Sequence, residues 1–507
     1  MRILGHLVVL GAAFLALPVF AQPTPPVSVT GGEISGTDNG EVRTFLGVPF
    51  AAPPVGDLRW RPPQAVVPWS GVKAATAFSP ACAPNADWLP NPKSEDCLYL
   101  NVWAPENAKD LPVIVWIHGG AMDSGTAAVP VQDGANLAKR GAIVVTINYR
   151  LGIFGFFSHP ELSAESPEHV SGNQGILDQI AALRWVQDNI TTFGGDPNRV
   201  TIMGCSSGGE SVALLVASPL AKGLFQRAVA ESGNDALPIN PDDSHRFNDK
   251  ATAEANGLAF AKAVGAEHMA DLRKLDIKAL QTQAWLPRVY VDDYLLHSDL
   301  TTIYRNHEQN DVPLLVGWTA EEGKDLIVFY MDPDRLTVAG RIEQMTRLLG
   351  RPPSDTLLTA YPGTTDAEAT ASMHRLMNDW WGWRMAQWAD LQTKYGHSRS
   401  YVYYFAHRPA EPPTPCNWGC GAGHGVEVQY LFDNLDVDPR AWSAEDRQLA
   451  AQLADTVVRF AATGDPNGAV LPIWPAFDGS NASILPIGNR TELQARPLPD
   501  FSVFSKP

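Results

Sequence analysis

The sequence lacks several features that would assign it to other classes of protein. Its 507 residues carry a formal net charge of −17 and include no basic patch, so we expect no nucleic-acid partner. After residue 21 no apolar stretch reaches the roughly 20 residues that span a bilayer, so we expect no membrane insertion. The chain also lacks a low-complexity linker and any repeat that would build a solenoid or propeller.

The first 21 residues have the pattern of a secretory signal. Arg2 precedes an apolar run from Leu7 to Leu17, and the segment ends in Val19-Phe20-Ala21, with small residues where a signal peptidase cleaves. The run is too short for a transmembrane anchor. We therefore expect a secreted or periplasmic protein, cleaved after Ala21, in which residues 22–507 form a single domain with long insertions.

Apolar runs and helical periodicity indicate the fold class. Residues 112–117 and 142–147 are short runs rich in β-branched residues, as buried parallel strands are. Residues 176–190, and the four-residue spacing of Leu449, Leu453 and Val457, indicate helices. We expect an α/β fold in which helices cover both faces of a mostly parallel sheet. Reactive groups would then lie on loops beyond the carboxyl ends of the strands.

A serine lies in a sharp turn between an expected strand and an expected helix. Val200 to Met203 reads as a strand, Gly204-Cys205-Ser206-Ser207-Gly208 as a turn, and Glu210 to Ala217 as a helix. This is the G-x-S-x-G nucleophile elbow in its required context, with glycines where the turn is too tight for side chains. Ser206 is therefore the predicted nucleophile.

The nucleophile needs donors for the oxyanion that its attack creates. His118-Gly119-Gly120-Ala121 follows the expected strand 112–117 and has the glycine-rich form of an oxyanion loop. We expect the backbone N–H groups of Gly120, Ala121 and Ser207 to form the oxyanion hole.

Further short motifs follow one another along the chain in the order in which they occur in a known family. They are Gly47–Ala51, Pro53–Trp60, Ser94–Asn101, Asn148–Arg150, Gly172-Asn173, Phe193–Asn198, Phe460-Ala461 and Gly464–Asn467. In these segments the sequence resembles the type-B carboxylesterases of the α/β-hydrolase fold, which include cholinesterases and many bacterial esterases. The resemblance runs from about Val27 to about Trp474.

The resemblance implies the other catalytic residues. The family's G-x-x-x-x-E-G segment matches Gly317 to Gly323, which makes Glu322 the acid and Glu321 a bystander. Its G-A-x-H-x-x-E segment matches residues 421–427 and implies His424 as the base, with Glu427 beside it. By analogy, Ser232 hydrogen-bonds to the acid. The implied activity is hydrolysis of a small-molecule carboxylic ester, with no metal and no cofactor.

Four of the five cysteines form two close pairs, which favours disulfides in an exported protein. The resemblance implies a Cys82–Cys97 disulfide, and it also implies buried ion pairs of Arg59 with Glu95 and of Arg150 with Asp196. The remaining thiol, Cys205, has three interpretations. It is a buried inert thiol beside a Cys416–Cys420 disulfide, or it bonds to Cys416 or Cys420, or it is a reactive redox thiol.

Two features bear on the substrate. The family usually has glutamate where this chain has Cys205, so the missing charge favours neutral or acidic esters over cationic ones. Trp380, Trp381 and Trp383 lie in the region that helps to line the acyl pocket of relatives, which suits an aromatic or bulky acyl group. Aromatic residues at helical spacing also occur as plain core.

Two alternatives follow from the same residues. A serine amidase or peptidase would use the same groups, although it should also cleave esters, which have better leaving groups. Some relatives of this fold have lost the serine and act in adhesion, but this chain keeps Ser206, Glu322 and His424.

Overall fold

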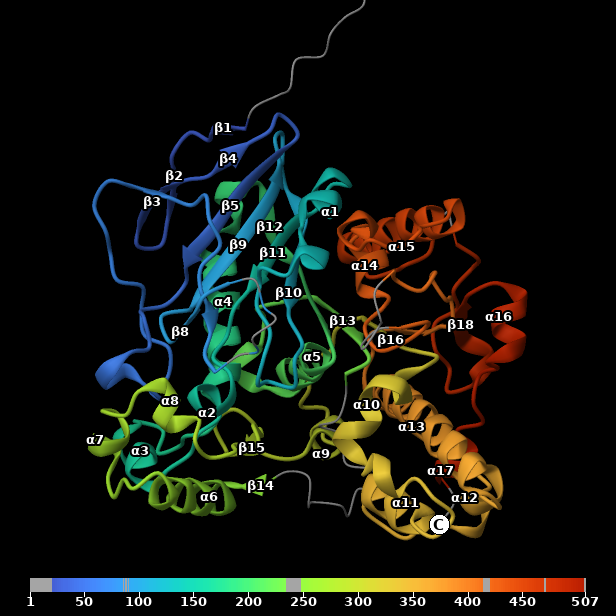
Figure 1. Cartoon of the computed structure of the whole chain (residues 1–507). Coiled ribbons are helices and arrows are strands. Elements are labelled where there is room, and N and C mark those ends of the chain that lie inside the picture. The colour runs from blue at the N-terminus through green and yellow to red at the C-terminus, as the bar shows by residue number, and fades with distance from the viewer. Residues whose placement is uncertain are drawn as a thin grey trace, which may run out of the picture.

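A computed structural model of the chain describes residues 21–84, 86, 89, 91–233, 248–413, 420–468 and 471–505. Its centre is an 11-stranded sheet with the strand order β1-β4-β5-β9-β11-β10-β12-β13-β16-β17-β18 (Figure 1). Those strands are β1 (Gln22–Pro23), β4 (Thr37–Asp38), β5 (Val42–Pro49), β9 (Tyr99–Pro105), β10 (Leu111–Ile117), β11 (Ile143–Ile147), β12 (Gly195–Cys205), β13 (Arg227–Glu231), β16 (Leu314–Thr319), β17 (Ser400–Phe405) and β18 (Ile484–Ile487). Residues 1–20 of the expected signal segment lie outside the described residues.

The larger part of the sheet is parallel. Every neighbouring pair from β11 to β18 runs parallel, whereas β9, β5, β4 and β1 pair antiparallel at the other edge. The loops that follow β10, β12, β16 and β17 therefore leave the sheet at one edge, because the carboxyl ends of parallel strands meet there. The expected mostly parallel sheet is confirmed.

The sheet has a hydrophobic core on each face. Along β10, Val113, Val115 and Ile117 belong to one core, whereas Ile114 and Trp116 belong to the other. Successive side chains of a strand point to opposite faces, so an uninterrupted apolar run is what a strand covered on both sides requires.

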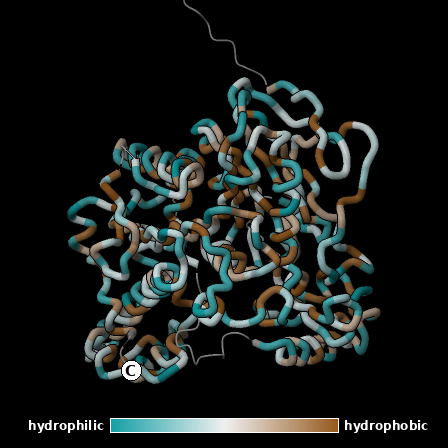
Figure 2. Tube along the Cα trace, turned by 180° about the vertical axis from the view of Figure 1, so that it is seen from behind, coloured by the Kyte–Doolittle hydropathy of each residue, from teal (hydrophilic) through white to brown (hydrophobic). Residues whose placement is uncertain are grey.

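Helices cover both faces. One core contains residues of α4 (Gln174–Asn189), α5 (Ser207–Ala217), α9 (Leu300–Arg305), α10 (Glu322–Tyr330), α11 (Arg341–Leu349), α12 (Asp355–Ala360), α13 (Asp366–Tyr395) and α17 (Ser502–Ser505). The other contains residues of α1 (Ala135–Lys139), α14 (Val428–Leu431) and α15 (Ala444–Thr463). Hydrophobic and hydrophilic residues are interspersed along the helices at the periphery of the molecule (Figure 2).

A third, smaller core lies away from the sheet. It contains residues of α2 (Gly152–Gly155), α3 (Pro160–Glu165), α6 (Lys250–Ala263), α7 (Met269–Leu272) and α8 (Ile277–Leu280), which lie in one region of the molecule (Figure 1). The α-helices also include α16 (Arg490–Ala495), and the strands of the small sheets are β2 (Val27–Val29), β3 (Gly32–Ser35), β6 (Val72–Ala74), β7 (Ala81–Cys82), β8 (Lys93–Ser94), β14 (Asn248–Asp249) and β15 (Tyr290–Val291).

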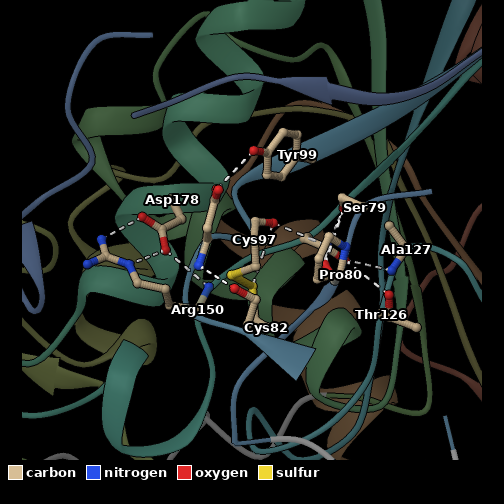
Figure 3. Close-up of a disulfide and its surroundings, with 12 residues drawn as sticks. Ser79, Pro80, Cys82, Cys97, Tyr99, Thr126, Ala127, Arg150 and Asp178 are labelled. Carbon is tan, nitrogen blue, oxygen red and sulfur yellow. Dashed lines mark hydrogen bonds and ion pairs between the residues drawn. A yellow bond between two sulfur atoms is a disulfide. The ribbon is translucent and has the colours of Figure 1, made fainter. Parts of the chain in front are cut away.

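Covalent and ionic links fix the segments around β9. The structure contains the Cys82–Cys97 disulfide that the resemblance implies, close to the start of β9 (Figure 3). Arg59 forms the implied ion pair with Glu95 at 2.5 Å, and its Nη1 also donates to the carbonyl of Leu275 at 2.7 Å. These contacts tie the amino-terminal loops to the third core.

The implied partner of Arg150 is wrong. Its guanidinium pairs with Asp178 on α4, and Nε and Nη2 each donate to one carboxylate oxygen at 2.7 Å (Figure 3). Arg150 comes after the carboxyl end of β11, whereas Asp196 lies at the amino end of β12. In a parallel sheet those positions fall at opposite edges, so Asp196 is out of reach and instead accepts from its neighbour Asn198.

The buried Arg150–Asp178 pair yields a prediction for stability. Because the Asp178 side chain is fully buried, Asp178→Asn leaves the guanidinium without its counter-charge. We expect a loss of about 3–5 kcal/mol in unfolding free energy, measured by urea denaturation. In the control, Asp390→Asn breaks a partly exposed pair with Lys394 and should cost at most about 1 kcal/mol. If both variants lost the same unfolding free energy, the buried pair would contribute no more to stability than the exposed pair does.

Candidate active site

The turn between β12 and α5 holds Ser206 in a strained conformation. Ser206 has φ 60° and ψ −128°, a region that non-glycine residues rarely adopt. Its N–H donates to the carbonyl of Glu231 at 2.8 Å, which ties the turn to the end of β13. A Cβ atom at Gly208 would lie 2.1 Å from the carbonyl oxygen of Ile117, so only glycine fits there. The sequence thus places a half-buried serine at the carboxyl edge of the sheet.

The glycine loop after β10 packs directly against this turn. A Cβ atom at Gly119 would lie 2.6 Å from the carbonyl oxygen of Cys205. The N–H of Met122 donates to Ser207 Oγ at 3.1 Å. Gly120 and Ala121, the expected oxyanion residues, lie between these two anchors and have φ of 110° and 56°. The loop is therefore held beside Ser206 from both ends.

The carboxylate of Glu322 is fully buried at the start of α10, just after β16. Its Oε1 accepts from the N–H of Thr319 at 2.8 Å and from Ser232 Oγ at 2.5 Å. Its Oε2 lies 2.6 Å from His424 Nδ1. Ser232 follows Glu231, whose carbonyl binds the Ser206 N–H, so one short segment contacts both the serine turn and the acid.

The loop that carries His424 is anchored through α10. The N–H of His424 donates to Asp325 Oδ2 at 2.8 Å, and the N–H of Ala422 donates to Glu321 Oε2 at the same distance. A Cβ atom at Gly425 would lie 3.5 Å from Cys205 Sγ, which brings this loop against the serine turn. Sequence reasoning missed Asp325, although its spacing of three from Glu322 places both on one helix face.

Burial and neighbouring charge set the protonation of the two histidines. Burial alone would lower the pKa of His424, but the charge of Glu322 and its hydrogen bond outweigh this effect and raise it. Burial lowers the pKa of His118 to about 4, so this ring is neutral at pH 7. His118 stacks on Tyr149 with ring centroids 4.6 Å apart and helps to shape the glycine loop.

A group of buried acids surrounds the serine turn. Burial raises the pKa of Glu427 to about 8, and the charge of Glu322 adds to the shift. Burial also raises the pKa of Glu231, reinforced by Glu427. Neither carboxyl oxygen of Glu231 has a hydrogen-bond partner among the residues that the structure describes. A carboxyl group in such surroundings favours its neutral, protonated form.

Cys205 is a free, buried thiol. The alternative in which it bonds to Cys416 or Cys420 is therefore wrong, and Cys420 is already disulfide-bonded. Cys416 lies outside the described residues. Burial, followed by the charge of Glu427, raises the pKa of Cys205. A thiol that holds its proton reacts slowly, which argues against a redox role.

The three tryptophans of α13 occupy different surroundings. Trp380 is fully buried in the core, and Trp383 stacks on Phe504 with centroids 5.2 Å apart. Trp381 instead lies beside His424, with centroids 6.3 Å apart and the rings nearly perpendicular. All three tryptophans thus belong to the same hydrophobic core, and Trp381 in addition lies beside His424.

The described segments contain neither a cluster of metal-ligating side chains nor a membrane-spanning helix. No group of three or more His, Cys, Asp or Glu residues among them is arranged to hold a metal ion. No helix among the same residues combines the length and apolar character needed to cross a bilayer.

A parallel sheet that brings a serine turn, an acid and a histidine to one edge, in this chain order, defines an α/β-hydrolase. A family model described as the carboxylesterase family matches residues 23–500. The chain belongs to this family, whose enzymes hydrolyse carboxylic esters.

Characterised relatives cover most of the chain. Fumonisin B1 esterase from Sphingopyxis macrogoltabida is 36% identical over 497 residues, which cover 91% of this chain and 87% of that protein. Para-nitrobenzyl esterase from Bacillus subtilis (strain 168) is 34% identical over 92% of this chain and 95% of that protein. A solved structure of PNB esterase aligns with a TM-score of 0.75 and 34% identity, covering 89% and 93% of the two chains.

The raised pKa of Glu427 yields a prediction for stability against pH. The folded protein holds a proton on Glu427 that the unfolded chain releases above the ordinary pKa of 4.5. The contribution of this proton to the unfolding free energy is therefore complete below pH 4.5 and is lost as the pH rises towards about 8. The loss approaches about 1.4 kcal/mol per pH unit within that window. Glu427→Gln cannot titrate and should lose less stability between pH 5 and 9 in urea denaturation.

The matched control is Glu445→Gln, which changes an exposed glutamate in the first turn of α15. Its stability should follow the wild-type curve. If the Glu427→Gln curve also ran parallel to wild type, Glu427 would not titrate in this window.

Proposed function

We propose that this chain hydrolyses carboxylic esters through an acyl-enzyme, with Ser206 as nucleophile, His424 as general base and Glu322 as the orienting acid. The observation that carries the proposal is the 2.6 Å contact between Glu322 and His424 Nδ1, made by a loop that packs against the strained serine turn. A serine hydroxyl becomes an effective nucleophile when a base removes its proton as it attacks.

In the proposed mechanism, His424 Nε2 accepts the Ser206 proton as Oγ attacks the ester carbonyl. Glu322 fixes the ring through Nδ1 and stabilises the imidazolium. The imidazolium then protonates the departing alcohol, the acyl group stays on Ser206, and water repeats the attack with His424 again as base. The acid is released and Ser206 regains its proton.

The negative oxygen of each tetrahedral intermediate requires donors. The N–H groups of Gly120, Ala121 and Ser207 are the proposed donors, supported by the packing of residues 119 and 122 against the serine turn. Glycine at 119 and 120 keeps this loop free of side chains that would separate it from the substrate.

For the substrate, we propose neutral or acidic esters with a bulky acyl or alcohol group. The raised pKa of Cys205 keeps the residue before the nucleophile uncharged, so nothing at that position attracts a cation. The proposal of a bulky group is supported by the names of three relatives, fumonisin B1 esterase, para-nitrobenzyl esterase and cocaine esterase, each of which names a bulky ester or ester group.

For the location, we propose that the chain is exported and that residues 22–507 form the mature single domain. The Cys82–Cys97 disulfide supports export, because disulfides persist in oxidising compartments. The proposed signal at residues 1–21 would direct the export.

The proposed nucleophile and base can be tested with matched variants. Ser206→Ala and His424→Gln should each lower kcat for p-nitrophenyl butyrate by up to about 10⁶-fold. Wild type, but not Ser206→Ala, should react with a fluorophosphonate. His407→Gln is the control, because His407 is also buried and lies 2.7 Å from a carboxylate, that of Asp446, yet it has no place in the proposed site.

That control should retain activity. Near-wild-type turnover by Ser206→Ala, or wild-type protein that resists the fluorophosphonate, would overturn the proposed nucleophile. An enzyme that cleaved an anilide as fast as the matching ester would favour the amidase alternative.

The proposed charge preference has a separate test. Because the position before the nucleophile is uncharged, a choline ester should react no faster than its neutral 3,3-dimethylbutyl isostere, compared by kcat/KM. A choline preference in the wild type would contradict the proposal.

A further inference from the structure

Three acidic residues at the start of α10 hold the segment that carries His424. The N–H of Ala422 donates to Glu321 Oε2 at 2.8 Å. His424 Nδ1 lies 2.6 Å from Glu322 Oε2, and the backbone N–H of the same histidine donates to Asp325 Oδ2 at 2.8 Å. The proposed base is therefore held at two points, by its ring and by its backbone, from a single helix.

Helix geometry places Asp325 beside the proposed acid. Residues three apart on an α-helix lie on one face, and here both carboxylates contact His424. Glu322 and Asp325 also lie in the first turn of α10, where the helix dipole favours negative charge. A Cβ atom at Gly423 would lie 2.5 Å from Asp325 Oδ2, so glycine at this position lets the carboxylate reach the backbone of the next residue.

The contact between Asp325 and His424 is buried. The two residues are 7% and 3% exposed. A hydrogen bond to an ionised acceptor is stronger than one between neutral groups, and its removal from a buried place leaves the donor unpaired. Loss of the acceptor at position 325 should therefore loosen the backbone that carries the proposed base.

The charge of Asp325 also acts on the ring of His424. Burial lowers the pKa of His424, whereas the charge and hydrogen bond of Glu322, and then the charges of Glu427 and Asp325, raise it. Because burial raises the pKa of Glu427 to about 8, this acid is mostly protonated at neutral pH and adds little charge. Glu322 and Asp325 therefore supply most of the negative charge that stabilises the imidazolium.

Other titratable groups around the histidine segment are paired or protonated. The carboxylate of Glu321 forms ion pairs with Arg496 at 3.1 Å and with Arg408 at 3.5 Å. Cys205 and Glu231, on the side of the serine turn, keep their protons because burial raises the pKa of each. The charge at position 325 is therefore not duplicated by these neighbours.

We infer that Asp325 is a positioning residue for the proposed reaction, which holds the backbone of His424 in place and, together with Glu322, stabilises the imidazolium. The inference rests on the proposed function, because it requires His424 to be the base. The two effects are separable. The acceptor oxygen fixes the geometry of proton transfer, on which kcat depends, and the charge sets the pH above which the ring can act as a base.

Asp325→Asn and Asp325→Ala separate these two effects. Asparagine keeps an acceptor oxygen for the N–H of His424 and removes the charge, so the imidazolium should lose its proton at a lower pH. The acid limb of kcat/KM for p-nitrophenyl butyrate should move down by roughly 0.5–1 pH unit. Alanine also removes the acceptor, so Asp325→Ala should show the same shift and in addition a kcat about 10-fold lower, with KM nearly unchanged.

Asp292→Asn is the matched control. Asp292 is also 7% exposed and also accepts backbone N–H groups, from Leu295 at 2.7 Å and from Tyr294 at 3.0 Å. These contacts lie in the segment after β15 rather than at His424. Asp292→Asn should therefore leave the acid limb at its wild-type pH, even where it lowers stability.

The rate at which a fluorophosphonate labels Ser206, measured against pH, gives a second readout of the same base. Its acid limb should move as that of kcat/KM does. An unmoved limb in Asp325→Asn, or an equal shift in Asp292→Asn, would overturn the inference, while ester hydrolysis by the wild type would uphold the proposed function. Equal kcat values in the two Asp325 variants would overturn the role of the backbone contact.

Two further outcomes are distinguishable. If Asp325→Ala does not fold, the pH profile of Asp325→Asn still decides. If the wild type neither cleaves the ester nor reacts with the fluorophosphonate at any pH, the proposed function fails and the inference falls with it.

Discussion

The carboxylate of Glu322 joins three separate parts of the chain at one buried point. It accepts from the N–H of Thr319 beside it, from Ser232 Oγ after β13 and from His424 Nδ1 after β17. A buried carboxylate is tolerable only when hydrogen bonds or opposite charge compensate for lost water. The position of the histidine loop and the protonation of its ring therefore depend on the same contacts that make the burial of Glu322 possible.

Two of the acids around this point are kept from adding further charge. Glu231 and Glu427 are fully buried, and the pKa of each is raised, first of all by burial. Burial also raises the pKa of Cys205. Two carboxylates therefore act on the proposed base: Glu322 contacts its ring, and Asp325 accepts from its backbone N–H. Burial favours the protonated forms of Glu231 and Glu427, so these two acids add little negative charge around the imidazolium.

Local patterns in the sequence predicted much of the fold. The uninterrupted apolar runs of β10 and β11 indicated strands covered on both faces, and the two cores explain why every position is apolar. The glycines around Ser206 indicated the turn between β12 and α5. Both features depend on residues close in sequence, so they could be predicted without coordinates.

Contacts between distant segments could not be predicted in the same way. The partner of Arg150 depends on the edge of the sheet at which each residue lies. Arg150 follows the carboxyl end of β11, whereas the implied partner, Asp196, lies at the amino end of β12 and so at the opposite edge. The state of Cys205 depends on distances between thiols that sequence spacing does not define. Likewise, tryptophans 380, 381 and 383 have similar sequence surroundings, but the rotation of α13 brings Trp381 to the histidine.

The alternation of β10 between two cores has a consequence for how this enzyme can vary. Adjacent side chains of β10 belong to opposite faces, so a single-residue insertion or deletion would exchange both sets at once. The same slip would turn the glycine loop that follows Ile117 away from the serine. We therefore expect natural variation in this strand to proceed by exchange of one apolar side chain for another, at constant strand length.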